Sequence, residues 1–190
     1  MTTVDKNDLL EKLFNQTEEQ LACAVHTFQN LPVETMLRPG ENNGWSIAQC
    51  MEHLNRYGAY YLPEIKSALV RAKLRRNATI FRSSWLGNYF TLMMDPSTGV
   101  KKVKAFKDYV PDRHLDVAAV TAEYIRQLEE LTIYLRQAYG TDLAGARVPV
   151  SIARVIRLRL GDVLRFVVAH NERHFRQMKR ALQPQAQALP

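Results

Sequence analysis

Two histidines four residues apart, His170 and His174, are the residues of this sequence whose type and spacing most directly suggest chemistry. Residues three or four apart lie on one face of a helix, and the surrounding segment has that period. The other members of this face are Val163, Phe166, Val167, Gln177 and Ala181. Side chains four residues apart have Cβ atoms roughly 5–6 Å apart, so two imidazoles could bind one metal ion. The alternative is two core histidines that share a face.

A third histidine, His53, lies on a second predicted helix. Ser46 is a favourable N-cap, and Gln49 three residues later completes a capping box. Trp45 is expected to pack on Cys50 across this helix start. The helix start fixes the phase of the helix and places His53 on one face with Ile47, Cys50, Tyr57 and Tyr61. One metal ion with three neutral imidazole ligands would explain why three histidines lie on apolar faces.

The two motifs resemble those of the DinB-like superfamily of metalloenzymes, which includes YfiT-like proteins and low-molecular-weight-thiol transferases. The motifs are Trp45-Ser46-x-x-Gln49-x-x-x-His53-Leu54 and His170-x-x-Arg173-His174-x-x-Gln177, and the resemblance spans about residues 8–182. It implies an antiparallel four-helix bundle in which His53, His170 and His174 bind one divalent metal ion. The family usually has Glu where this chain has Gln49, and either residue can close a capping box.

Four long helices must position these residues, and their periodicity predicts an all-α fold. We expect the helices over Lys6–Asn30, Ser46–Lys73 and Asp116–Tyr139, and from Asp162, as its cap, to about residue 182. Long connections separate the second helix from the third and the third from the fourth. The first should contain a short amphipathic helix around Trp85–Met94, and the second, residues 145–161, should be partly helical. Residues 1–182 are expected to form one domain, followed by a disordered tail over 183–190.

The composition limits the functional classes. The chain has 190 residues, of which 46% are hydrophobic, and its net charge of +7 favours anionic substrates or partners. Cys23 and Cys50 fall inside predicted helices, which favours reduced thiols and a cytoplasmic protein. No apolar run approaches the ~20 residues of a membrane span, and no signal peptide is recognisable. Nucleic-acid binding is disfavoured because the basic residues are spread over several loops without a recognition motif.

Several residues near the histidines are candidates for lining a cavity. Tyr57 follows His53 by one turn, Cys50 precedes it by one turn, and Gln177 follows His174 by three residues. Simple core packing is the alternative for Cys50 and Tyr57. Two further residues, Glu52 and Glu172, could accept hydrogen bonds from imidazole N–H groups or could face solvent. Arg173 is expected at the rim or in an interhelical ion pair.

Three histidine ligands leave positions open for water or substrate, as in catalytic zinc sites. Zn or Ni is the first expectation for the metal, and Cu and Fe also suit imidazole ligands. The resemblance implies a metal-dependent enzyme, a transferase that moves a low-molecular-weight thiol to an electrophile, or a hydrolase. The alternative is a metal-binding stress-response protein without turnover. Thus the expected ligands are one divalent metal ion and a small-molecule substrate.

A homodimer is also expected. Trp85, Tyr89, Phe90 and Met93 form an apolar cluster outside the four main predicted helices. Exposed apolar clusters often mark subunit contacts, and twofold dimers are the commonest closed assembly.

Overall fold

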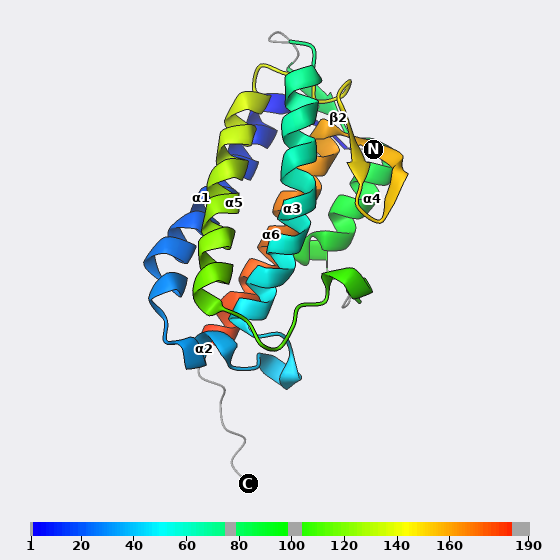
Figure 1. Cartoon of the computed structure of the whole chain (residues 1–190). Helices are drawn as coiled ribbons and strands as arrows, with labels where there is room; N and C mark the ends of the chain where they lie inside the picture. Colours follow the sequence, from blue (N-terminus) through cyan, green and yellow to red (C-terminus); the bar gives the residue numbers. More distant parts are fainter. Residues whose placement is uncertain (1, 75–78, 99–103, 184–190) are drawn as a thin grey trace.

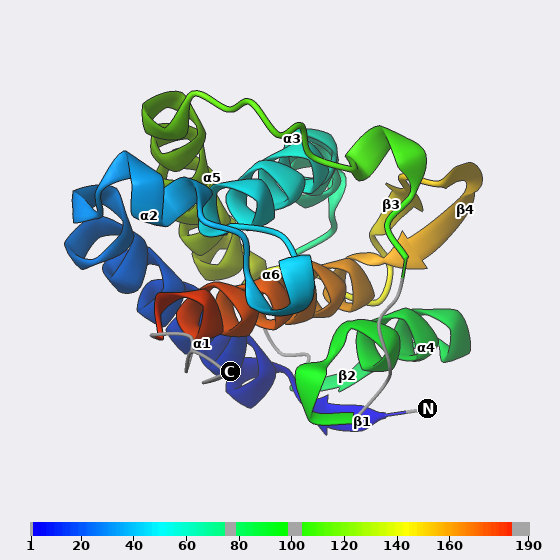
Figure 2. The ribbon, with the colours of Figure 1, turned by 90° about the horizontal axis from the view of Figure 1, so that it is seen from below.

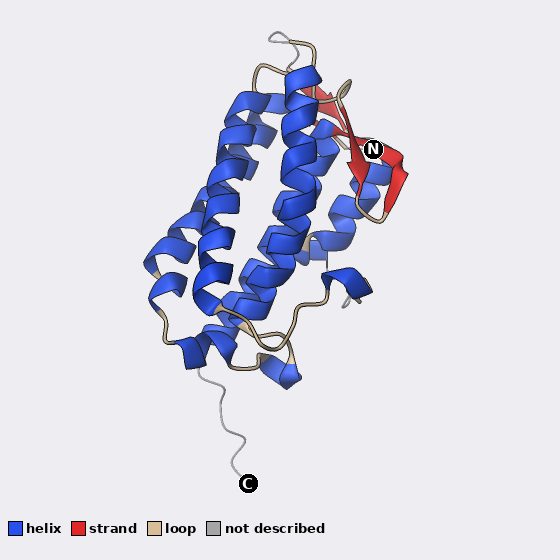
Figure 3. Ribbon diagram, in the orientation of Figure 1, coloured by secondary structure: helices blue, strands red, loops and turns tan. Residues whose placement is uncertain are grey.

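The chain is mostly helical, as expected for an all-α protein (Figures 1 and 3). A computed structural model describes residues 2–74, 79–98 and 104–183. The described α-helices are α1 (Lys6–His26), α2 (Val33–Leu37), α3 (Ile47–Arg71), α4 (Trp85–Met94), α5 (Val117–Ala138) and α6 (Leu160–Leu182). Apart from Gln183, the tail expected over 183–190 lies outside the described residues.

Four long helices pack side by side, with α3 against α5 and α6, and with α1 against the same two helices (Figures 1 and 2). Three of their N-termini, those of α1, α3 and α5, begin where the sequence predicts. Asp5 caps α1, Ser46 and Gln49 form the expected capping box at α3, and Asp116 caps α5. Side chains at these positions satisfy backbone N–H groups that have no partner within the helix.

The first helix is shorter than expected. It ends at His26, and the Thr27 N–H bonds to the Cys23 carbonyl oxygen. A separate 3₁₀ turn over Phe28–Asn30 follows before Pro32, which cannot continue a helix. In this turn Phe28 is fully buried, so the segment after α1 still contributes an aromatic ring to the core.

Two small antiparallel sheets were not expected from the sequence. Strand β1 (Thr3–Asp5) pairs with β2 (Ile80–Arg82), and β3 (Arg147–Val150) pairs with β4 (Ala153–Arg159). The expectation of partly helical structure over 145–161 is wrong, because this connection forms the β3–β4 hairpin. Val148 and Val150 are buried on alternating positions, which is the period of a strand with one face on a core.

Helix α6 follows β4 directly, so Asp162 is not its cap. Arg159 occupies the cap position, and the fully buried Asp162 carboxylate instead joins α6 to the start of α4. It accepts hydrogen bonds from the Ser83 hydroxyl, the Ser84 hydroxyl at 2.7 Å and the Ser84 N–H at 3.0 Å. The approach is close enough that a Cβ atom on Gly87 would lie 2.4 Å from Asp162 Cβ.

The apolar core consists of two clusters. One includes Leu10, Ile65, Leu135 and Val163, and the other includes Phe28, Ile47, Met51 and Phe175. Among the described residues, no helix is both long and apolar enough to cross a membrane.

Candidate metal centre

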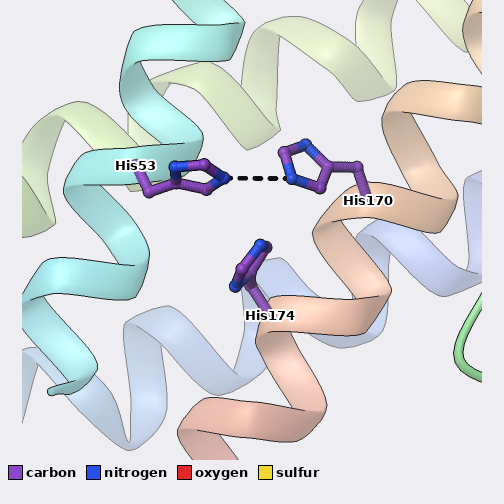
Figure 4. Close-up of side chains that lie close together, drawn as sticks. All are labelled: His53, His170 and His174. Atoms are coloured by element: carbon purple, nitrogen blue, oxygen red, sulfur yellow. Dashed lines mark hydrogen bonds between the residues drawn. The ribbon is translucent and has the colours of Figure 1, made fainter. Parts of the chain in front are cut away.

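Three buried histidines from two helices meet inside the molecule (Figure 4). His53 comes from α3, and His170 and His174 come from consecutive turns of α6. Each offers one ring nitrogen, and these nitrogens all lie within 4.8 Å of one another. The shortest separation is 3.1 Å, between Nε2 of His53 and Nε2 of His170. Zn–N bonds are about 2.0–2.1 Å long, so this spacing suits three nitrogens around one ion after small adjustments.

Hydrogen bonds hold two of the three rings in orientations that suit ligation. The Nδ1–H of His53 donates to the carbonyl oxygen of Tyr109 at 2.7 Å, and that of His174 donates to Oε1 of Gln177 at 3.1 Å. A neutral imidazole that donates through Nδ1 keeps its lone pair on Nε2. Metal-binding histidines commonly donate their second nitrogen to a carbonyl or similar acceptor in this way.

Burial keeps all three imidazoles neutral. It is the main cause that lowers the pKa of His53 to about 4, although the hydrogen bond to Tyr109 opposes the shift. Burial also lowers the pKa of His174 to about 3, and the neighbouring His53 adds to this effect. The pKa of His170 is lowered well below its ordinary value by burial and then by His174 and His53. Only neutral imidazole binds a metal ion, so the cluster is in its ligating form at neutral pH.

Aromatic rings enclose the histidines. The Trp45 ring centroid lies 4.7 Å from that of His53 and 5.8 Å from that of His174. On the other side, the Tyr57 ring centroid lies 4.6 Å from His170 and 4.0 Å from the stacked ring of Tyr109. These rings restrict the movement of the imidazoles and limit the water that reaches them from these sides.

The other candidate residues have different surroundings. Gln177 orients His174, and Tyr57 packs on His170, so both lie at the cluster. Cys50 is completely buried in the core cluster of Ile47 and Met51, and burial raises the pKa of its thiol to about 12. It is therefore a neutral thiol within the packed core.

The two glutamates do not serve the imidazoles in this structure. Glu52 pairs with Arg56 at 2.8 Å, and Glu172 pairs with Arg176 at 2.6 Å. Both pairs have the i, i+4 spacing that favours local ion pairs on a helix, a signal that the sequence contains. Arg173, by contrast, has no ion pair among the residues that the structure describes.

Sequence reasoning missed the roles of Tyr109 and Trp45. The Tyr109 carbonyl lies in the connection between α4 and α5, and a backbone carbonyl has no side-chain signature that would identify it. Trp45 was assigned to packing on Cys50, and its ring lies over two imidazoles. Its place directly before the capping box, eight residues before His53, was the available signal.

One comparison with known proteins identifies a family for this chain. The family model described as the DinB superfamily matches residues 16–178, which include all three histidines. Comparison with curated proteins and with solved structures gave no match.

Proposed function

Because this chain belongs to the DinB superfamily, we propose that it is a metal-dependent enzyme whose divalent ion is bound by His53, His170 and His174. The observation that carries the proposal is the convergence of three neutral ring nitrogens within 4.8 Å in a buried site. The donor set fits Zn²⁺ or Ni²⁺, both of which bind imidazole well. We also propose that α1, α3, α5 and α6 form the antiparallel four-helix bundle that the resemblance implied.

The proposed reaction is the transfer of a low-molecular-weight thiol to an electrophile. A divalent ion at this site would act as a Lewis acid and would favour the thiolate over the thiol at neutral pH. In the overall reaction the thiol loses its proton to solvent, its sulfur forms a bond to the electrophilic carbon, and the leaving group departs with the electron pair of the broken bond.

The chain's own residues have distinct roles in this proposal. Tyr109 and Gln177 keep the lone pairs of His53 and His174 directed at the site. Tyr57 and Trp45 exclude water from its flanks, which strengthens electrostatic interactions inside it. None of the described acidic side chains has a place at the cluster as a general base, so proton removal depends on the lowered pKa of a bound thiol. The free thiols Cys23 and Cys50 support a cytoplasmic location.

An accessible cleft favours an enzyme over a protein that only stores metal. A cleft of about 690 Å³ is lined in part by His174 and Gln177, so the cluster has a route to solvent. A purely structural metal site is normally closed by four protein ligands. Here the described residues supply three.

A conjugation assay tests this function. The purified protein, without a histidine tag, is loaded with Zn²⁺ or Ni²⁺ and incubated with L-cysteine and monochlorobimane, whose adduct is fluorescent. We expect the metal-loaded protein to accelerate adduct formation and the His174→Ala protein to lose the acceleration. Equal rates for both proteins and for a chelator-treated sample would refute a metal-dependent transfer and would favour the stress-response alternative.

A further inference from the structure

The cleft beside the histidines has walls from three parts of the chain. One wall is the turn at residues 40–45, a second is residues 173–181 of α6, and the third includes Pro96 and Lys104. Figure 2 shows the turn before α3 lying across the C-terminal half of α6. Because His174 and Gln177 line the same cleft, a molecule bound there lies beside the candidate metal centre.

The charges that line this cleft are mostly positive. Arg173 and Arg180 are seven residues apart on α6, so they lie on one face, and Lys104 belongs to the third wall. Glu41 is the one carboxylate among the lining residues. The described residues give none of the three cations an ion pair. Arg180 and Lys104 are exposed, and Arg173 is half-buried.

Arg173 is the most informative of these cations. It is half-buried, and its charge contributes to lowering the pKa of both His170 and His174. The neighbouring Arg176 on the same helix is exposed and pairs with Glu172 at 2.6 Å. A metal cation bound by the three histidines would repel the unpaired guanidinium of Arg173 next to it. A bound anion would compensate both charges.

Gln177 supplies a neutral donor to the same place. Its Oε1 atom accepts the hydrogen bond from His174, which leaves its Nε2 group free to donate elsewhere. That Nε2 lies near the turn, 4.0 Å from the position that a Cβ atom on Gly44 would take. The cleft therefore presents guanidinium, ammonium and amide donors together, a set that suits the oxygens of a carboxylate or phosphate.

The turn that faces these donors has an unusual backbone. Asn42 and Asn43 both have φ of 54°, in the left-handed region that most residues avoid. The turn is closed by hydrogen bonds from Gly40 N–H to the Gly44 oxygen and from Gly44 N–H to the Glu41 oxygen, both 3.0 Å long. It is thus a defined wall that holds two amide side chains at the edge of the cleft.

We propose that this cleft binds the anionic group of a small molecule, a carboxylate or a phosphate, between Arg173, Arg180 and Lys104. The rest of the bound molecule extends to the histidine cluster. The inference rests on the proposed function in one respect: it identifies the substrate as an anion whose reactive group lies at the metal. Anion binding itself does not require the metal.

Calorimetric titrations of the full-length protein, with and without Zn²⁺ and at low salt, test the proposal. The probes are succinate, methyl phosphate and the neutral analogue succinamide. We expect at least one anion to bind ten or more times more tightly than succinamide, and the stronger of the two anions identifies carboxylate or phosphate as the preferred group. Raising the salt concentration should weaken the binding, because mobile ions screen exposed charges.

The two matched variants each remove one positive charge from α6. Arg173→Gln removes it inside the cleft, and Arg176→Gln removes it outside the cleft. We expect Arg173→Gln to weaken anion binding tenfold or more and Arg176→Gln to change it less than twofold. Arg173→Lys, which keeps the charge but loses the planar fork, should fall between the wild type and Arg173→Gln. Equal effects of the two glutamine variants, or equal affinities for succinate and succinamide, would overturn the proposal.

The metal content of each sample separates this inference from the proposed function. Anion binding that Arg173→Gln weakens in a protein that takes up no metal would support the cleft and refute the metalloenzyme. Metal uptake that requires the three histidines, together with an anion affinity that Arg173→Gln does not change, would support the metal site and refute the anion-binding cleft. Melting temperatures of the variants establish that each one is folded before it is titrated.

Discussion

The Nδ1 atom of His53 lies 2.7 Å from the carbonyl oxygen of Tyr109, 56 residues further along the chain. This contact ties α3 to the connection between α4 and α5. It fixes the lone pair of His53 on Nε2, the nitrogen that faces His170. The connection therefore acts on the candidate metal centre directly, by orienting one of its three ligands.

Tyr57 should matter for metal affinity because its ring holds this connection in place. The ring stacks on Tyr109 and contacts the edge of His170. We expect Tyr57→Ala to lower metal affinity roughly tenfold, a size typical for lost partners of ligating residues. Competition titration against a chromophoric chelator measures this. Tyr89→Ala, which removes an exposed ring from α4, is the control and should leave the affinity unchanged.

Asp162 should be important for stability because its buried carboxylate joins α6 to α4. Replacing it with Ala leaves the Ser83 and Ser84 donors without their charged acceptor. Hydrogen bonds to charged groups contribute about 1.5–3 kcal/mol each, so we expect a loss of about 3 kcal/mol in the free energy of unfolding. Urea denaturation checks this value. Asp116→Ala, which removes a helix cap with one hydrogen bond, should cost about 1 kcal/mol.

Acid should release the metal and destabilise the fold over a defined range of pH. The pKa of His53 is lowered to about 4 and that of His174 to about 3, whereas unfolded histidines titrate near ~6.5. Between these values the unfolded chain binds more protons than the folded chain, so stability is complete above about pH 6.5 and is lost as pH falls toward 4. Bound metal adds stability until protons displace it near the lower end of this range.

Melting temperatures measured against pH, with and without a chelator, test this behaviour. The chelator should lower the melting temperature at pH 7.5, and the two curves should converge as the pH approaches 4. Curves that coincide from pH 7.5 down to pH 5 would mean that the histidines are ordinary core residues.

The homodimer remains a prediction, and the structure narrows the surface that could form it. Of the four apolar residues in the predicted contact, Phe90 and Met93 are half-buried and line an apolar pocket. Trp85 and Tyr89 are 70% and 54% exposed, with their ring centroids 6.2 Å apart. Light scattering should give twice the chain mass of 21.9 kDa. The Trp85→Glu protein should be monomeric, and a wild-type monomer at high concentration would contradict the prediction.

Much of the helical structure could be predicted from the sequence because its signals are local. The Ser46–Gln49 capping box and the four-residue spacing of His170 and His174 each lie within a few residues, and they fixed the helix start and the shared face. The resemblance of the two histidine motifs to the family then predicted that His53 lies at the same site as His170 and His174. The four-residue spacing of Glu172 and Arg176 is a local signal of the same kind, and it indicates the ion pair that these two residues form.

The remaining features depend on contacts that sequence patterns do not encode. The Tyr109 carbonyl is a backbone group from a distant segment. Asp162 has the sequence position of a helix cap, and only folding brings the serines of a separate segment next to it. The β3–β4 hairpin is too short for its alternation to stand out against the neighbouring helix. The charged cleft arises from three segments that become neighbours only after folding.

Metal stoichiometry is the most direct test of the three-histidine site. The wild-type protein, purified without a tag and dialysed against Zn²⁺ or Ni²⁺, should retain one ion per chain by elemental analysis. His53→Ala and His174→Ala should each lower the affinity by orders of magnitude while the protein remains folded, and His26→Ala, an exposed histidine on α1, should match the wild type. A His53→Ala protein that retains one full equivalent of metal would contradict the assignment.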